Sequence, residues 1–203
     1  MLNFRYSQHG VSMIELLISV VIIGILAAIG APALSSWIQN GQIRVTAESI
    51  QNGLQLARAE AVHRNTAVRF QLTTTTDNTC ALSTANSNWV ISLDDPTDPA
   101  ISATLCASTP SDTVAPRIIQ ARPSSEGSRN AVVAATQSTF TFNGLGRLTT
   151  AADTISVSNP TGGACATIAA PNGPMRCLNV AVTTGGQVRM CNPAKASTDP
   201  QGC

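Results

Sequence analysis

The order of apolar and polar positions divides the chain into three stretches. Residues 16–34 carry no charged side chain, and Glu15 stands directly before them. A helix needs about 20 apolar residues to cross a bilayer, so this stretch is long enough to span one. A carboxylate beside such a stretch is costly on insertion scales. Glu15 is therefore predicted to serve a function and to have a partner of opposite charge.

Three interpretations of this stretch are open on the residues alone: a secretory signal peptide, an ordinary membrane anchor and a specialised segment. The residues 31–33, Ala-Pro-Ala, offer a small-x-small cleavage site. The stretch is longer than the about 7–15 apolar residues of a signal peptide, and a helical pattern continues beyond it. An ordinary anchor would leave Gly10 and Glu15 without a role.

The second stretch has apolar residues at intervals of four and three. They are Ile43, Ala47, Ile50, Leu54, Ala57 and Ala61. This period is that of an amphipathic helix, and the positions between them are mostly polar. The pattern predicts that one helix continues to about Arg64. Pro32 removes one backbone donor, so we expect it to kink this helix without ending it.

The third stretch is a series of short alternating segments separated by turn residues. Strands are predicted at 67–72, 89–93, 117–121, 138–142, 154–158, 177–182 and 187–191. Residues 183–186, Thr-Thr-Gly-Gly, are typical of a hairpin loop. The whole pattern predicts an α+β protein, with one long N-terminal helix and a β-rich head over residues 65–203.

Charge and cysteine content add a compartment to this picture. The 203 residues hold 12 Lys and Arg against 11 Asp and Glu, and this net charge of +1 is too small to attract nucleic acid to the whole chain. Six cysteines behind an apolar N-terminal segment indicate an oxidising compartment and disulfides. The candidates are Cys80, Cys106, Cys165, Cys177, Cys191 and Cys203. A bond between Cys80 and Cys106 is favoured because both flank the strand at 89–93, and the other four are not paired here. Cys177 and Cys191 fit a cross-hairpin or loop disulfide better than a metal site.

Catalytic motifs are absent from the sequence. The two histidines are His9, near the N-terminus, and His63, at the expected helix end. No histidine and cysteine have the spacing of a zinc site, and neither a nucleophile elbow nor a phosphate-binding glycine loop is present. The sequence therefore predicts no enzyme, no cofactor and no metal.

The N-terminal residues resemble the class III signal of type IV pilins. Gly10 is followed by an apolar residue, Glu15 stands five positions after it, and a spanning stretch with Pro32 inside comes next. The resemblance implies that prepilin peptidase removes residues 1–10 between Gly10 and Val11 and that Val11 is N-methylated, although the first mature residue of the family is usually Phe. It also implies a membrane and filament-core half of the helix at 11–34 and an amphipathic half at 35–64. Glu15 would then pair with the N-terminal amine of a neighbouring subunit.

The head resembles the GspH/FimT/FimU group of minor pilins and pseudopilins, through residues 140–147, Phe-Thr-Phe-Asn-Gly-Leu-Gly-Arg, and 186–191, Gly-Gln-Val-Arg-Met-Cys. The resemblance implies the type IV pilin fold, with a β-sheet packed on the second half of the helix. It further implies a minor pilin that primes assembly or joins the tip complex. Its partners would be other pilins, through the N-terminal helix, and prepilin peptidase. Its location would be the bacterial inner membrane, with the head in the periplasm, and then the filament.

Two alternatives remain within that group. One is a GspH-like pseudopilin of a type II secretion system. The other is a FimT-like pilin that binds DNA for natural transformation through a Gly-Arg-x-Arg motif, of which this chain keeps Gly186 and Arg189 but has Gln187 in place of the first arginine. Arg147 and Arg176 could complete a basic patch with Arg189. Whether these three arginines cluster is the test of the DNA alternative.

Overall fold

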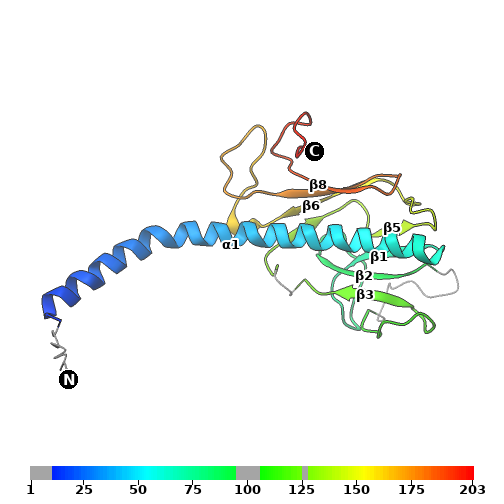
Figure 1. Ribbon diagram of the computed structural model, residues 1–203, viewed down its shortest axis with the longest axis horizontal. Coiled ribbons are helices and arrows are strands. Elements are labelled where there is room, and N and C mark those ends of the chain that lie inside the picture. The colour runs from blue at the N-terminus through cyan, green and yellow to red at the C-terminus, as the bar shows by residue number, and fades with distance from the viewer. Residues whose placement is uncertain (1–10, 95–105, 125–127) are drawn as a thin grey trace, which may run out of the picture. The chain divides into compact units, whose positions relative to one another are not determined.

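The computed structural model describes residues 11–94, 106–124 and 128–203, without the side chains of residues 31–33. Contacts group the chain into two compact units, one ending at Trp37 and the other comprising Ile38–Cys203. A single 52-residue helix, α1 (Met13–Arg64), contributes to both (Figure 1). The predicted continuation of the helix past Pro32 to Arg64 is confirmed. The kink at Pro32 stays a prediction.

The start of α1 is capped by Ser12. The Ser12 Oγ accepts a hydrogen bond from the Glu15 backbone N–H at 3.2 Å, and the Leu16 N–H donates to the Ser12 carbonyl. A serine at this position satisfies one of the free donors of a helix N-terminus. Ser12 and Glu15 also have the spacing of a capping box, a signal that is visible in the sequence but was not used there.

In the described part of the head, eight strands form two antiparallel four-stranded sheets. The first sheet has the order β3-β2-β1-β5 and consists of β1 (Val68–Thr73), β2 (Asn88–Leu93), β3 (Ile118–Arg122) and β5 (Thr139–Phe142). The second has the order β4-β6-β7-β8 and consists of β4 (Val132–Ala134), β6 (Asp153–Ser158), β7 (Leu178–Val182) and β8 (Val188–Cys191). The seven predicted strands are confirmed to within a residue or two at their ends. The three-residue β4 was not predicted.

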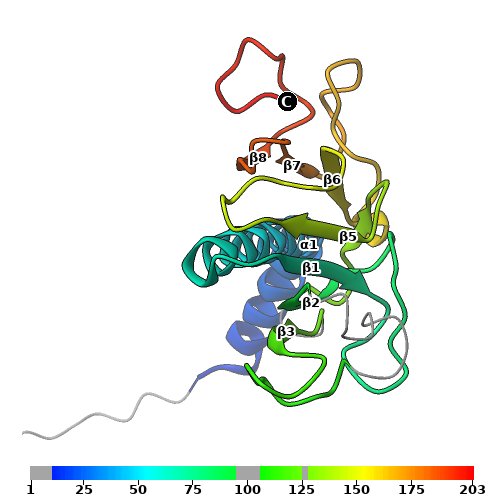
Figure 2. The same ribbon diagram turned by 90° about the vertical axis from the view of Figure 1, so that its right-hand side faces the viewer.

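The main core lies between the two sheets and the second half of α1 (Figure 2). All six predicted stripe residues of α1, from Ile43 to Ala61, have no exposed surface. They pack against aromatic side chains of the first sheet and aliphatic ones of the second, including Phe70, Trp89, Phe140, Ile155 and Val180. The amphipathic pattern therefore identified the face of α1 that the head covers.

A smaller core lies within the head beside the first sheet. It consists of Cys80, Val90, Cys106 and Ile118 and holds the Cys80–Cys106 disulfide that the sequence favoured. The remaining bonds are Cys165–Cys177 and Cys191–Cys203, each closing a local loop. Cys177 and Cys191 thus form loop disulfides with other partners and not a bond across the hairpin.

Candidate assembly site

The apolar surface of the first unit is fully open. Every residue from 11 to 30 is exposed, and an 18-residue window of α1 has a mean hydropathy of 2.6 with none of it buried. By length and composition this helix can cross a membrane. Soluble monomers rarely expose an apolar patch of this size, so the surface marks a contact with lipid or with other proteins.

Glu15 is the one carboxylate on this surface and lies in the first turn of α1. Its side chain is exposed, as is Val11 just before the helix. A helix N-terminus carries partial positive charge, which favours a carboxylate in the first turn. The Glu15 carboxylate is therefore accessible to a cation of another molecule.

Three predictions about the N-terminal segment are not tested by the structure: the cleavage site, the kink at Pro32 and the partner of Glu15. Gly10 and the rest of residues 1–10 lie outside the described residues, so cleavage between Gly10 and Val11 stays a prediction. The side chain of Pro32 is also outside them, although its backbone is helical. The pairing of Glu15 with a neighbouring subunit stays a prediction as well.

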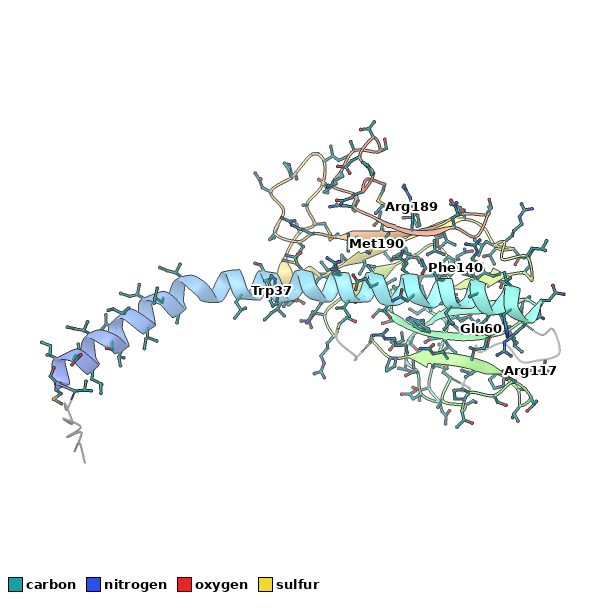
Figure 3. All side chains as sticks on the ribbon, viewed as in Figure 1. Trp37, Glu60, Arg117, Phe140, Arg189 and Met190 are labelled. Carbon is teal, nitrogen blue, oxygen red and sulfur yellow. A yellow bond between two sulfur atoms is a disulfide. The ribbon has the colours of Figure 1, made fainter. Side chains whose placement is uncertain are left out.

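Trp37 was missed by the sequence analysis. Trp37 (Figure 3) is the last residue of the first unit. Its exposed fraction is 73%. The other tryptophan, Trp89, is buried and donates a hydrogen bond from Nε1 to the Ser49 hydroxyl at 3.0 Å. A lone tryptophan just beyond a spanning stretch is the signal that could have identified it, because indoles concentrate at membrane interfaces.

The three arginines proposed for DNA binding do not gather in one patch. Arg147 follows Gly146, whose carbonyl accepts a hydrogen bond from Arg58 Nε at 3.1 Å. The Arg176 backbone N–H donates to the side-chain oxygen of Asn40 at 2.7 Å. Positions 40 and 58 of α1 are about 27 Å apart at 1.5 Å per residue. Arg147 and Arg176 therefore start from opposite ends of the head.

Arg189 lies on β8 and is exposed. One of its guanidinium nitrogens donates to the Gly202 carbonyl at 3.4 Å. This contact joins the edge strand to the C-terminal tail, which the Cys191–Cys203 bond also holds. Arg189 thus has a structural contact in addition to its charge.

Hydrogen bonds shift the pKa of Asp77, in a loop, and of Arg64, at the end of α1. Hydrogen bonds from the Thr79 side chain, the Thr79 backbone and the Thr75 hydroxyl lower the pKa of Asp77, in the loop before Cys80. At the end of α1, hydrogen bonds to Glu60 and Asp112 raise the pKa of Arg64. Within the described part of the chain, no three His, Cys, Asp or Glu side chains group as metal ligands would.

Comparison with known families gives two matches. A prokaryotic N-terminal methylation motif matches residues 5–31, a range that includes Gly10 and Glu15. The family described as type II transport protein GspH matches residues 46–186, most of the head and the helix half it covers. An exposed apolar N-terminal helix with a methylation motif defines the class of pilin-like proteins. The chain belongs to the GspH family within that class.

Two solved structures resemble the chain, both of the type IV minor pilin FimU of Pseudomonas aeruginosa strain PAO1. The first has 15% identity and a TM-score of 0.47 and covers 77% of this chain and 93% of its own. The second has 14% identity and a TM-score of 0.46, with 77% and 98% covered. Comparison with curated proteins finds no match. The family assignment rests on the two family models.

Proposed function

We propose that this protein is a minor pilin of a type IV pilus that helps to prime assembly or forms part of the tip complex. The observation that carries the proposal is the exposed apolar surface of α1 over residues 16–30, with one carboxylate, Glu15, in the first turn. The second compact unit, Ile38–Cys203, follows it in the chain. A subunit of this kind can be anchored in the bilayer before assembly. In the filament, its apolar surface would contact the helices of other subunits.

The proposed maturation supplies the partner of Glu15. Cleavage between Gly10 and Val11 frees an α-amine, which stays cationic after N-methylation. A carboxylate in an apolar surrounding is costly unless a cation offsets it. The amine of a neighbouring subunit provides that cation only when the two helices are in register. The pair thus favours one arrangement of helices in the filament.

The orientation in the membrane follows from the flanking charges. Arg5 precedes the spanning stretch, and positive residues are retained on the cytoplasmic side. The head would then lie in the periplasm, where its three disulfides form. Inner-membrane anchoring with a periplasmic head is therefore part of the proposal.

A second candidate is a pseudopilin of a type II secretion system, which the description of the matching family favours. The same anchored subunit would then join a short periplasmic filament. The DNA-binding alternative required Arg147, Arg176 and Arg189 to cluster, and Arg147 and Arg176 start from opposite ends of the head. We therefore do not propose it.

Deletion of the gene separates the two candidates. We expect loss of surface pili, scored by electron microscopy and by pilin in the sheared fraction, while export of secreted enzymes continues. Re-expression of the full chain should restore the pili. Intact pili together with lost enzyme secretion would reject the minor-pilin proposal in favour of the pseudopilin.

A further inference from the structure

Strand β8 is the outer strand of the second sheet, and half of its backbone groups point away from that sheet. Thr183 N–H donates to the Gln187 carbonyl, which makes Thr183 and Gln187 a hydrogen-bonded pair at the hairpin end. Such pairs alternate along an antiparallel ladder, so Arg189 and Cys191 also bond to β7. The backbone groups of Val188 and Met190 therefore face outward.

The next residue provides a check on this alternation. Asn192 must face outward if Val188 and Met190 do, and its N–H donates away from β7, to the Gln201 carbonyl at 2.7 Å. The C-terminal tail thus covers the edge at Asn192. Among the described residues, no segment outside the β7–β8 ladder forms a backbone hydrogen bond with Val188 or Met190. A protein rarely leaves an edge strand open without a purpose or a protecting charge.

Two hollows lie between this edge and α1. The first measures about 520 Å³ and is lined by Gln55, Arg58, Ala59, Val62, His63 and Val188. The second measures about 320 Å³, and its lining includes Arg44, Leu178 and Met190. Figure 3 labels Arg189 and Met190 on β8, above α1. The side chains of Val188 and Met190 are half-buried against the core, so they line the hollows from the sheet side.

The first hollow carries positive charge, and the second is close to neutral. Arg58 and His63 line the first, and no carboxylate does. In the second, Arg44 is the charged residue and is bonded to Glu48 at 2.8 Å. The exposed Val62 and Ala59 give the first hollow an apolar floor. The surface thus combines outward-facing backbone groups, an apolar floor and the guanidinium of Arg58.

We propose that the β8 edge is a docking site for an extended segment of a neighbouring pilin-class subunit, added as a fifth strand of the second sheet. Backbone bonds to Val188 and Met190 would hold the segment, as in other cases of strand addition. Its inward residues would be apolar, to cover Val62 and Ala59, and a carboxylate would meet Arg58 and His63. The inference rests on the proposed function, because it needs a filament partner.

A second copy of this chain fits the edge poorly. A symmetric antiparallel pair of β8 strands centred on Arg189 would place the two Arg189 side chains directly opposite each other. Like charges at that position are destabilising. Arg189 therefore discourages self-pairing while leaving the edge open to an acidic partner.

Amide hydrogen exchange tests the proposal on the full chain. The chain alone in detergent is compared with the same chain in sheared filaments. We expect the amides of Val188 and Met190 to exchange roughly tenfold or more slowly in the filament, because each gains a hydrogen bond. Arg189 and Cys191, already bonded to β7, serve as internal controls and should change little. Unchanged exchange at Val188 and Met190 in filaments that contain the chain would overturn the docking site. Absence of the chain from filaments would instead overturn the proposed function.

Two pairs of variants test the contacts themselves. Val188→Pro removes an outward N–H without breaking the β7 ladder, and Val188→Ala trims the side chain but keeps the N–H. We expect several-fold lower recovery of the proline variant in sheared filaments at equal melting temperature. His63→Glu should also lower recovery, whereas Arg129→Glu, just before β4 on the opposite edge of the sheet, should not. Equal recovery of the two Val188 variants would reject the edge contact. A concentration-dependent dimer of the full chain that Val188→Pro abolishes would place a second copy there and reject the heterotypic partner.

Discussion

At the scale of single residues, Glu15 is the side chain on which the proposed assembly depends. It is exposed in the first turn of α1, on a surface that is otherwise apolar. Its position costs little at the membrane boundary, where water reaches the helix N-terminus. In the filament interior it needs a cation, so its role is expected to appear at assembly and not at insertion.

Replacing Glu15 by Ala should therefore leave membrane insertion intact and reduce incorporation into filaments. Losing one partner of a buried ion pair costs about 3–5 kcal/mol, a factor of roughly 100 or more in an equilibrium constant, so we expect recovery to fall by at least about tenfold. Sheared pili and membranes are compared by quantitative immunoblot. Glu48→Ala, on the head half of the same helix, is the control and should be recovered like the parent. Equal recovery of the Glu15 variant would remove the pairing role.

Gly10→Ala should block processing. The precursor would keep its ten N-terminal residues and would run above the mature form on a gel, with mass spectrometry placing its N-terminus before Val11. Gly24→Ala is the matched control, because a Cβ there meets nothing within 4 Å. Normal maturation of the Gly10 variant would mean that the cleavage site lies elsewhere.

Gly53→Ala tests how closely α1 approaches the first sheet. Alanine favours a helix by about 1 kcal/mol over glycine, but a Cβ at Gly53 would lie 2.7 Å from the Phe70 ring and 3.1 Å from Trp89. Both rings are held in the core, so we expect a net loss of about 1–3 kcal/mol in unfolding free energy. Gly41→Ala on the same helix meets nothing within 4 Å and should stabilise the protein instead. Chemical denaturation distinguishes the two, and a stabilising Gly53 variant would show that the rings can move aside.

At the scale of elements, α1 was predictable because its signals are local. The stripe from Ile43 to Ala61 repeats at the helical period, and all of its members are buried. The short β4 was not predictable, since Val132–Ala134 is a strand only through its pairing with β6. The polar positions of β1 show the same limit: Arg69, Gln71 and Thr73 alternate with apolar residues, yet they too are buried. Distant segments decide their surroundings, such as Asp94, which pairs with Arg69 at 3.2 Å.

The candidate site was predictable to a similar extent. Glu15 and the apolar surface follow from charge and length alone. The openness of the β8 edge does not, because it depends on where the C-terminal tail bonds back, through the Gln201 carbonyl to Asn192 and through the Cys191–Cys203 disulfide. The separation of Arg147 from Arg176 likewise depends on two loops that reach different turns of α1.

The length of the apolar segment gives Trp37 a defined depth in the membrane under the proposed anchoring. From Glu15 to Leu34 the helix rises about 29 Å, close to the about 30 Å of the hydrocarbon layer. Trp37 lies about 4.5 Å further along, at the level where indoles prefer to sit. In liposomes its fluorescence should be quenched more by lipids brominated near the headgroup than by lipids brominated at the chain end.

Trp37→Phe supplies the control for this measurement. Only the buried Trp89 emits in that variant, and neither brominated lipid should quench it. Stronger quenching of Trp37 by the deep bromines would mean that the helix enters further than proposed. Quenching by aqueous acrylamide alone, on liposome-bound protein, would place Trp37 in water.

At the scale of the whole molecule, the disulfides differ in the amount of chain that they restrain. Cys80–Cys106 spans 26 residues, and Cys165–Cys177 spans 12. On the loop-entropy model these contribute about 3.5 and about 3 kcal/mol. The first bond also lies in the smaller core, so its removal opens buried space. We expect the Cys80→Ala, Cys106→Ala double variant to lower the melting temperature more than the corresponding double variant at Cys165 and Cys177. Thermal unfolding monitored by circular dichroism checks the order, and the reverse order would show that the smaller core contributes little.

The continuity of α1 also has a mechanical consequence. The helix that carries the apolar surface is the same helix whose later residues fill the main core. A pull on a filament would act along the axis of α1, and the six buried stripe residues would resist it together, in shear against the sheets. A load shared in this way must displace all six contacts at once, whereas peeling would break them one at a time. In a filament under tension, such a subunit would hold until all six contacts fail together.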